Sequence, residues 1–125
     1  MKIVLATGGF DPIHSGHISY LRAARALGDK LIVGLNSDNW LQRKKGSPFM
    51  PFDERKIVLQ NLEMVDVVTD FDDKDDTATH AIFKVLEKWK MPGDVIIFAN
   101  GGDRDADNIP EQIVYSGHSP VKFEF

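Results

Sequence analysis

The chain has 125 residues, 42% of them hydrophobic, which is typical of one domain with a single core. Its formal net charge of −4 lacks the surplus of Lys and Arg that neutralises nucleic-acid phosphates. The absence of cysteine excludes a disulfide scaffold, a thiolate nucleophile and a cysteine zinc site. No apolar run approaches the ~20 residues that cross a bilayer. We therefore expect one cytoplasmic domain over residues 1–125 that binds neither nucleic acid nor membranes.

Short runs rich in β-branched residues are nearly continuous in apolar character, which is typical of strands buried on both faces. They cover residues 3–6, 31–35, 65–68 and 95–98, and 121–125 form a last short candidate. Apolar spacing predicts helices over 18–28 with a cap at Gly28, over 53–65 with Asp53 as N-cap, and over 78–89. The alternation predicts an α/β fold, a doubly wound parallel sheet with helices on both faces.

An acidic run precedes the third predicted helix. It contains Asp70, Asp72, Asp73, Asp75 and Asp76. Runs of like charge are usually solvated, so we expect an exposed loop, with a metal site as the alternative.

The densest group of small and polar residues follows the first predicted strand. Residues 8–17 read GGFDPIHSGH and lead into the first predicted helix. In parallel sheets ligands gather at the carboxyl ends of strands, where small residues let a phosphate approach backbone N–H groups beside a helix N-terminus. The glycine and lysine spacings match neither a Walker A loop nor a GxGxxG fingerprint.

His14 and His17 stand three residues apart, so in a turn or helix they project to one side, with roughly 5–6 Å between Cβ atoms. Residue types alone leave three roles open. The pair contacts a phosphate, or serves in capping and the core, or binds zinc with further ligands such as His80 or His118.

This stretch resembles the HxGH signature of the nucleotidylyltransferase superfamily related to class I tRNA synthetases, whose members share a Gly-x-Phe-Asp-x-x-His-x-Gly-His turn. Further likeness extends to bacterial glycerol-3-phosphate cytidylyltransferases and heptose-phosphate adenylyltransferases. It lies in segments 19–21, 27–29, 31–33, 36–38 and 43–46. Gly101, Gly102 and Asp103 also resemble the heptose enzymes, so the likeness covers about residues 1–110.

The resemblance implies transfer of CMP from CTP, or AMP from ATP, to a phosphorylated sugar or polyol with release of pyrophosphate. The acceptor phosphate would attack the α-phosphorus in line, and it is already anionic at pH 7, so no general base is required. His14 and His17 would contact the triphosphate, and Lys45 or Lys44 would neutralise developing charge. Mg²⁺ would accompany the triphosphate, and homodimers are common among such enzymes.

The resemblance also implies the strand order 3-2-1-4-5, which brings the loops after the first and fourth strands into one crevice. The nucleotide would contact Gly8, Gly9, Phe10, Gly16, Gly102, Asp103 and Arg104. The acceptor would contact Asp11, Asp38 and Arg55. From residue types alone, the glycine pair 101–102 also suits a turn without ligand, and Arg55 also suits an exposed helix surface.

Three features depart from the family pattern. Gly9 stands where many relatives carry Thr or Ser, and Glu63 where the cytidylyltransferase branch tends to have arginine. The family's Ile-Ser-x-Thr-type segment at a helix N-terminus has no convincing counterpart at 116–119. Such hydroxyls would bind phosphates, so a module that binds nucleotides without turnover is the alternative function.

Two groups of aromatic residues have simpler interpretations. Trp40 and Trp89 are expected to pack in the core rather than stack on a base. The apolar segment 49–52 follows the lysines, and it suits either an acceptor pocket or a dimer contact.

Overall fold

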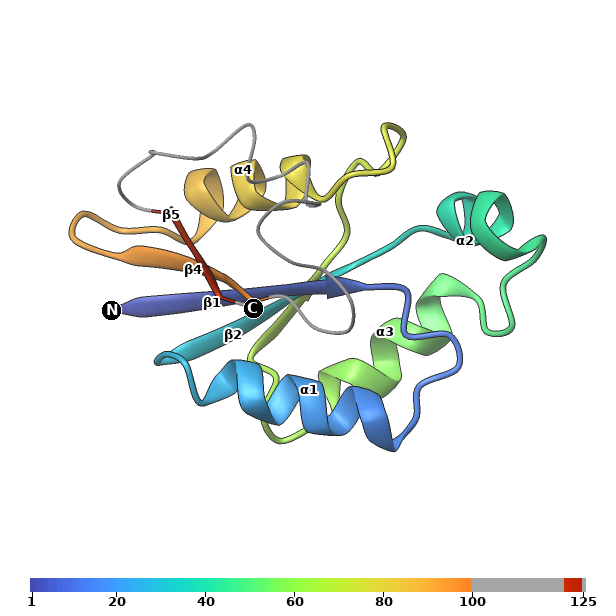
Figure 1. Ribbon diagram of the computed structural model, residues 1–125, viewed down its shortest axis with the longest axis horizontal. Coiled ribbons are helices and arrows are strands. Elements are labelled where there is room, and N and C mark those ends of the chain that lie inside the picture. Colours follow the sequence, from blue (N-terminus) through green and yellow to red (C-terminus); the bar gives the residue numbers. More distant parts are fainter. Residues whose placement is uncertain (100–120, 125) are drawn as a thin grey trace.

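The computed structural model describes residues 1–99 and 121–124, which form a parallel sheet with helices on both faces (Figure 1). The strands are β1 (Lys2–Gly8), β2 (Lys30–Leu35), β3 (Val67–Thr69), β4 (Val95–Ala99) and β5 (Val121–Glu124). The helices are α1 (Ser15–Arg25), α2 (Asp38–Lys45), α3 (Phe52–Gln60) and α4 (Thr79–Lys88). In the described part of the chain, no helix has the length and apolarity to span a bilayer.

The sheet order is β3-β2-β1-β4-β5, and every pair is parallel. This confirms both the predicted α/β class and the predicted strand order. The chain runs from β1 to one side through β2 and β3, and then returns to the other side through β4 and β5. The end of β1 is therefore the point where the strand order reverses, which is where open parallel sheets bind ligands.

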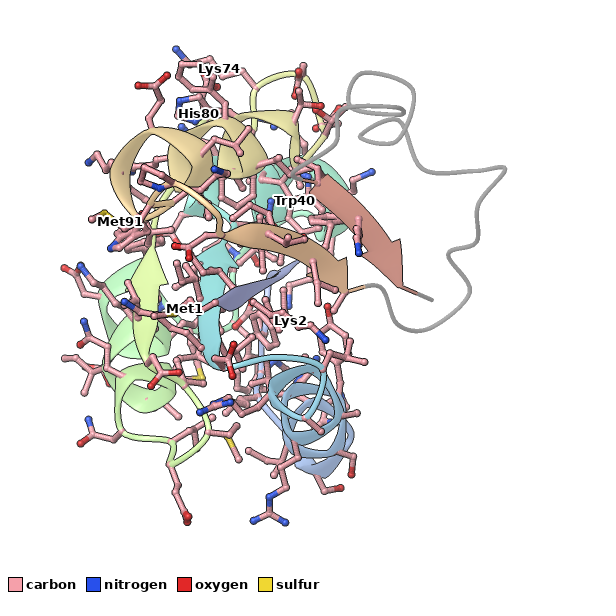
Figure 2. The ribbon with its side chains drawn as sticks, turned by 90° about the vertical axis from the view of Figure 1, so that its left-hand side faces the viewer. Met1, Lys2, Trp40, Lys74, His80 and Met91 are labelled. Carbon is pink, nitrogen blue, oxygen red and sulfur yellow. The ribbon has the colours of Figure 1, made fainter. Side chains whose placement is uncertain are left out.

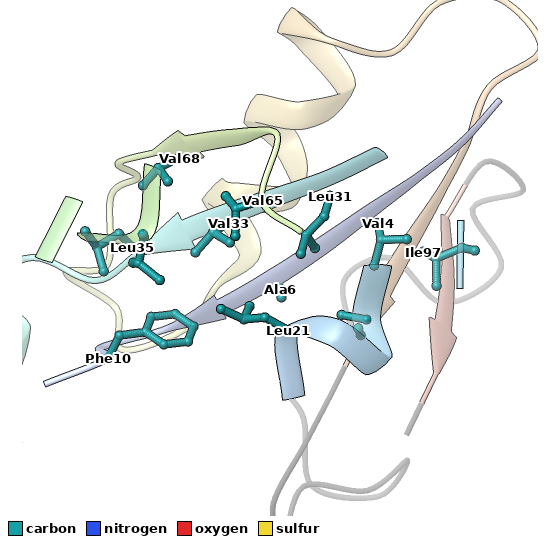
Figure 3. Close-up of a cluster of buried hydrophobic side chains, with 13 residues drawn as sticks. Val4, Ala6, Phe10, Leu21, Leu31, Val33, Leu35, Val65, Val68 and Ile97 are labelled. Carbon is teal, nitrogen blue, oxygen red and sulfur yellow. The ribbon is translucent and has the colours of Figure 1, made fainter. Parts of the chain in front are cut away.

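The residues of β1 alternate between two hydrophobic cores because successive side chains of a strand point to opposite faces. Val4 and Ala6 belong to the core under α1 and α3 (Figure 3), whereas Ile3 and Leu5 belong to the core under α4. Figure 2, viewed along the strands, shows the sheet between these two helical layers. Strands buried on both faces explain the near-continuous apolar runs of the sequence.

The first helix ends earlier than predicted. α1 stops at Arg25, with Ala26 rather than Gly28 as its C-cap, so the predicted cap is wrong. A glycine is needed at position 28 for a steric reason instead. A Cβ there would lie 2.7 Å from the carbonyl oxygen of Lys2 and 2.8 Å from a methyl group of Val4. The glycine therefore allows the α1–β2 connection to pass close to the start of β1.

The second predicted helix is shorter than expected at its C-terminal end. α3 has Pro51 rather than Asp53 as its N-cap, and it ends at Gln60 instead of reaching Val65. Asp53 lies in the first turn, where a carboxylate interacts favourably with the helix dipole. β3 accordingly begins at Val67, two residues later than predicted, whereas the helix predicted over 78–89 is confirmed as α4 with end caps at these two positions.

The helix α2 was not among the helices predicted from apolar spacing. Its sequence nevertheless carries the usual end signals. The Ser37 Oγ accepts a hydrogen bond from the Trp40 amide at 3.1 Å, and Gly46 ends the helix with a φ of 92°. Basic residues fill the last turn, where they interact favourably with the helix dipole.

The acidic run forms an irregular loop before α4, as predicted, and four of its five aspartates are exposed. Asp73 is the exception, because it is only 4% exposed. The expectation of a fully solvated loop is therefore wrong at this residue, whose carboxylate is surrounded by hydrogen-bond donors of the β2–α2 connection.

The close approach at Gly28 gives a stability prediction. Gly28→Ala is expected to lower the free energy of unfolding by about 1–3 kcal/mol, since the new methyl group meets backbone that cannot easily move. Urea unfolding measures the change. The control Ala23→Ser, at an exposed position of α1, is expected to stay within about 0.5 kcal/mol of the parent chain. Equal stability of Gly28→Ala and the parent would contradict the steric argument.

Candidate functional site

The loop between β1 and α1 is shaped by one buried aromatic side chain. Phe10 has a φ of 50°, in the left-handed region that non-glycine residues rarely adopt, and its side chain is only 4% exposed. Its ring lies edge-on to the ring of His17 with 5.1 Å between centroids. A Cβ on Gly8 would approach this ring to 3.1 Å. Burial of the Phe10 ring thus stabilises a loop conformation that would otherwise be strained.

His14 and His17 lie side by side at the start of α1, with ring centroids 3.9 Å apart. His14 is the N-cap, and its Nδ1 accepts a hydrogen bond from the Gly16 amide at 3.0 Å. The Nδ1 of His17 accepts one from the His14 amide at 3.2 Å. Because Nδ1 is the acceptor in both rings, the neutral form of each carries its proton on Nε2.

The two Nε2–H groups are available as donors. Within the residues that the structure describes, neither Nε2 has a hydrogen-bond partner. They lie beside the N-terminus of α1, an 11-residue helix whose dipole places partial positive charge at this end. The arrangement therefore offers two imidazole N–H donors and a helix terminus to an anion, which is the chemistry expected of a phosphate site.

Gly16 is required by the position of the His14 ring. A Cβ at Gly16 would lie 2.8 Å from His14 Cε1 and 3.0 Å from its Nδ1. Any side chain would push the ring away from the amide that it caps. The small residue between the histidines thus serves the geometry of His14, in addition to any contact with a nucleotide.

The imidazole of His17 is held in its neutral form. Burial lowers the pKa of His17 below its usual 6.5, and the neighbouring His14 lowers this pKa further by charge repulsion. His17 therefore acts as an uncharged donor at neutral pH. Positive charge for a polyphosphate must come from other residues.

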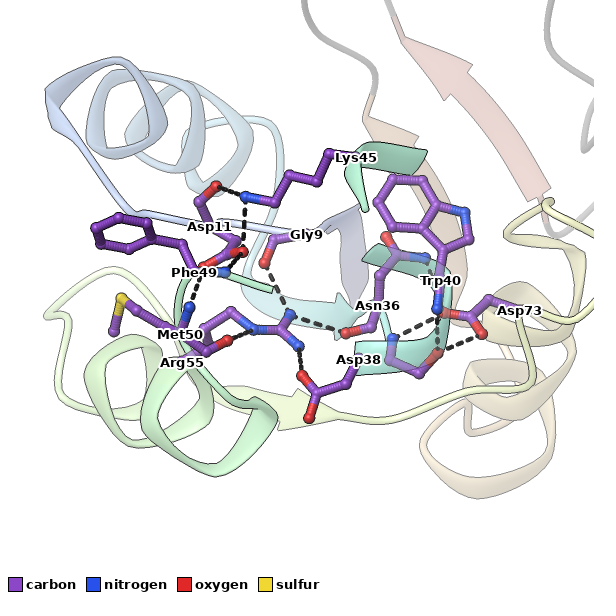
Figure 4. A network of polar contacts seen from close by, with 11 residues as sticks. Gly9, Asp11, Asn36, Asp38, Trp40, Lys45, Phe49, Met50, Arg55 and Asp73 are labelled. Carbon is purple, nitrogen blue, oxygen red and sulfur yellow. Dashed lines mark hydrogen bonds and ion pairs between the residues drawn. The ribbon is translucent and has the colours of Figure 1, made fainter. Parts of the chain in front are cut away.

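Asp11 and Lys45 form an ion pair across the loop, with 2.7 Å between Lys45 Nζ and Asp11 Oδ2 (Figure 4). The carboxylate of Asp11 is fully buried and also accepts hydrogen bonds from the amides of Phe49 and Met50, each at 2.6 Å. Burial acts to raise the pKa of Asp11, but Lys45 and these two amides outweigh it and lower the pKa. Asp11 therefore joins the β1–α1 loop to the segment that follows α2.

Arg55 connects four segments around the site (Figure 4). Its Nη1 donates to the carbonyl oxygens of Gly9 at 2.9 Å and Asn36 at 2.8 Å, and its Nε donates to the Met50 carbonyl at 2.9 Å. Its Nη2 forms a 2.6 Å ion pair with Asp38. The guanidinium therefore ties together the ends of β1 and β2, the start of α2 and the segment before α3.

The predicted acceptor residues differ in their exposure. Asp38 is 44% exposed, and it lies in the first turn of α2. Arg55 and Asp11 have fully buried side chains. The interpretation of Arg55 as an exposed helix arginine is wrong, and its burial gives it a structural role at the site.

The remaining predicted residues lie close to the loop or outside the described residues. Gly9 faces α2, since a Cβ there would lie 2.9 Å from Leu41 and 3.3 Å from the ring of Trp40. Lys44 is exposed, with its Nζ 5.6 Å from the centroid of the Trp40 ring. Gly102, Asp103 and Arg104 lie outside the described residues, so their predicted contacts with a nucleotide stay predictions.

Sequence reasoning missed three residues that support the site, namely Asn36, Ser37 and Asp73. Asn36 and Ser37 were noticed only as part of a resemblance, although Ser37 directly precedes a helix and is a standard N-cap residue. The sequence does not single out Asp73, because it is one of five aspartates in the same run and only the structure shows that it is buried.

Comparison with known proteins yields a family model and curated relatives. A model described as cytidylyltransferase-like matches residues 5–116. The chain is 42% identical over 114 residues to the bifunctional protein HldE of Citrobacter koseri, covering 82% of this chain and 24% of that protein. It is 44% identical over 110 residues to HldE of Yersinia enterocolitica, covering 86% and 21%. The chain thus spans less than a quarter of the length of these curated relatives.

Solved structures share the fold. A lipopolysaccharide core biosynthesis protein from Thermoplasma volcanium has a TM-score of 0.74 and 27% identity, covering 98% of this chain and 93% of that one. A bifunctional NMN adenylyltransferase/ADP ribose pyrophosphatase from Francisella tularensis has a TM-score of 0.64 and 15% identity, covering 98% and 37%. The second likeness concerns the fold alone.

The lowered pKa of His17 is measurable by NMR titration of its Cε1 proton. We expect a midpoint below 6.5, and in His14→Gln a midpoint closer to 6.5, because charge repulsion is removed while burial remains. The unfolded chain binds this proton more readily, so the contribution of His17 to stability falls as the pH drops from above 6.5 towards its folded pKa. A midpoint at or above 6.5 would contradict the argument.

The structural role of Arg55 predicts a large effect of a conservative change. Arg55→Lys keeps the charge but not the planar set of donors, and it is expected to lower the free energy of unfolding by about 2–3 kcal/mol in urea. Arg22→Lys, at an exposed position of α1, is the matched control and should change it by less than about 0.5 kcal/mol. Similar values for the two variants would show that the Arg55 contacts are dispensable.

Proposed function

Because the chain belongs to the cytidylyltransferase-like family, we propose that it is a nucleotidylyltransferase, which moves CMP from CTP or AMP from ATP to a phosphorylated sugar or polyol and releases pyrophosphate. The observation that carries this proposal is the pair of Nε2–H donors of His14 and His17 beside the N-terminus of α1. A sugar acceptor is supported by the likeness to a lipopolysaccharide core biosynthesis protein.

In this proposal the two histidines bind the triphosphate. In-line attack by the acceptor phosphate on the α-phosphorus forms a new P–O bond, and the bond to pyrophosphate breaks. Negative charge shifts onto the leaving pyrophosphate during this step. Donors held in place by the backbone stabilise that charge without having to reorganise, which is the main electrostatic contribution to such catalysis.

Lys45 is the proposed source of positive charge, and Lys44 is the neighbouring candidate. The Lys45 ammonium already lies at the loop, 2.8 Å from the carbonyl oxygen of Asp11, and its side chain is 37% exposed. A compact ammonium on a flexible stem is able to move from the buried Asp11 carboxylate to an arriving phosphate. Lys44 lies over the Trp40 ring and, among the described residues, forms no ion pair, whereas Lys45 is paired with Asp11.

For the acceptor, the structure favours Asp38 among the three predicted residues. Its Oδ1 is bound by Arg55, while the side chain as a whole is 44% exposed. The other carboxylate oxygen is then available to accept a hydrogen bond from a sugar or polyol hydroxyl. Asp11 and Arg55 are fully buried, so we assign them to positioning rather than to acceptor contact.

Mg²⁺ is proposed to enter with the triphosphate. Among the described residues no group of three His, Asp or Glu side chains is arranged to hold a metal ion, and the Asp11 carboxylate is taken up by Lys45 and two amides. These side chains do not fit a protein-built metal site, so the ion would be held by phosphate oxygens. A cytoplasmic location and a homodimer remain predictions.

Pyrophosphate release tests the function. Wild-type chain with CTP or ATP, Mg²⁺ and a panel of sugar phosphates and glycerol 3-phosphate is expected to release pyrophosphate. His14→Ala and His17→Ala should each lower kcat by about 10²–10³-fold, as the loss of one such donor typically does. Ser19→Ala, at an exposed position of the same helix, is the control and should leave kcat unchanged.

Two outcomes would contradict the proposal. Full turnover in both histidine variants would show that the donors are not used. A thermal shift with a triphosphate but no turnover with any acceptor would instead support the nucleotide-binding module.

A further inference from the structure

The buried carboxylate of Asp73 lies against the first turn of α2. Its Oδ2 accepts hydrogen bonds from the Ser37 amide at 2.8 Å and from Asn36 Nδ2 at 3.1 Å. Its Oδ1 accepts one from the Ser37 hydroxyl at 2.8 Å. Ser37 is the N-cap of α2. The hydroxyl that donates to Asp73 also accepts a hydrogen bond from the Trp40 amide. Asp73 thereby fixes the residue from which α2 starts.

The loop that carries Asp73 also contacts the last turn of α2. Arg43 Nη2 donates to the carbonyl oxygen of Asp73 at 2.8 Å and to Asp76 Oδ1 at 3.0 Å. Two residues further along the chain stands Lys45, whose ammonium meets Asp11. Residues 73–76 therefore hold α2 at both ends, far in sequence from the loop where the histidines lie.

We propose that Asp73 is a positioning residue for the transfer reaction, because its buried carboxylate fixes α2 and so sets where Lys45 presents its ammonium. This inference rests on the proposed function. Asp73 itself touches no reacting atom. Its effect on the reaction passes through the helix to the lysine.

The length of α2 explains why a contact at its first turn affects the position of its last turn, which carries Lys45. Eight residues of α-helix are about 12 Å long, so a tilt of about 10° about the first turn moves the last turn by about 2 Å. Misplacement of a catalytic group by about 1 Å is enough to cost up to about 100-fold in rate. The Arg55–Asp38 ion pair and the buried Leu41 also hold the helix, so we expect a smaller loss when Asp73 alone is removed.

A double-mutant cycle with Lys45 tests the inference. Asp73→Ala is expected to lower kcat about tenfold in the parent chain, with little further loss in a Lys45→Ala background, because the lysine through which it acts is gone. Asp72→Ala removes the same charge from the exposed neighbouring residue and should leave kcat unchanged. If Asp73→Ala does not fold, Asp73→Asn, which keeps one acceptor oxygen, takes its place in the cycle.

Hydrogen exchange provides a readout that does not depend on turnover. Asp73→Ala should accelerate amide exchange within residues 38–45 while the amides of β1 and β2 keep their protection. Unchanged exchange in α2, or equal loss of kcat with and without Lys45, would overturn the inference. Absence of turnover in the wild-type chain would overturn the proposed function instead, and the exchange result would still decide whether Asp73 fixes α2.

Discussion

The buried guanidinium of Arg55 is the constraint on which the rest of the site depends. It is a charged group with no exposed surface, and it is tolerable there because one carboxylate and three carbonyl oxygens surround it. Those partners come from the ends of β1 and β2, from α2 and from the segment before α3. Removing the guanidinium would free four segments at once, so the loop carrying His14 and the helix carrying Lys45 are positioned relative to each other through this side chain.

The proposed anion site carries little net charge of its own. The chain carries a formal charge of −4, and the carboxylates near the loop already neutralise the buried arginine and one lysine. What remains for a phosphate is a set of hydrogen-bond donors: two imidazole N–H groups and the start of α1. The lowered pKa of His17 is part of this arrangement, since burial favours the uncharged ring. The hydrogen bond from the His14 amide to Nδ1 places the proton of that ring on Nε2.

Sequence reasoning predicted the strands and the histidine loop because both depend on local patterns. Buried strands need continuous apolar runs, and a helix N-terminus after β1 needs small residues followed by a capping side chain. Sequence reasoning failed for residues whose burial is determined by contacts with distant parts of the chain. Nothing local distinguishes Asp73 from its exposed neighbours, or the buried Arg55 from an ordinary helix arginine, because burial of a charge depends on partners up to 46 residues away. The helix α2 is different, because its capping residues Ser37 and Gly46 are local signals that could have predicted it.

Three aspartates at the site have different roles because their surroundings differ. Asp11 is buried and paired with Lys45, so it joins two loops and holds the lysine at the site. Asp38 is paired with Arg55 through Oδ1 and is 44% exposed, which leaves its other oxygen for the proposed acceptor. The buried carboxylate of Asp73 accepts hydrogen bonds from the amide and hydroxyl of Ser37, and its carbonyl oxygen accepts one from Arg43. Asp73 therefore fixes α2. The same side chain therefore holds a cation, presents an oxygen to solvent or anchors a helix, according to how many of its oxygens the fold has already used.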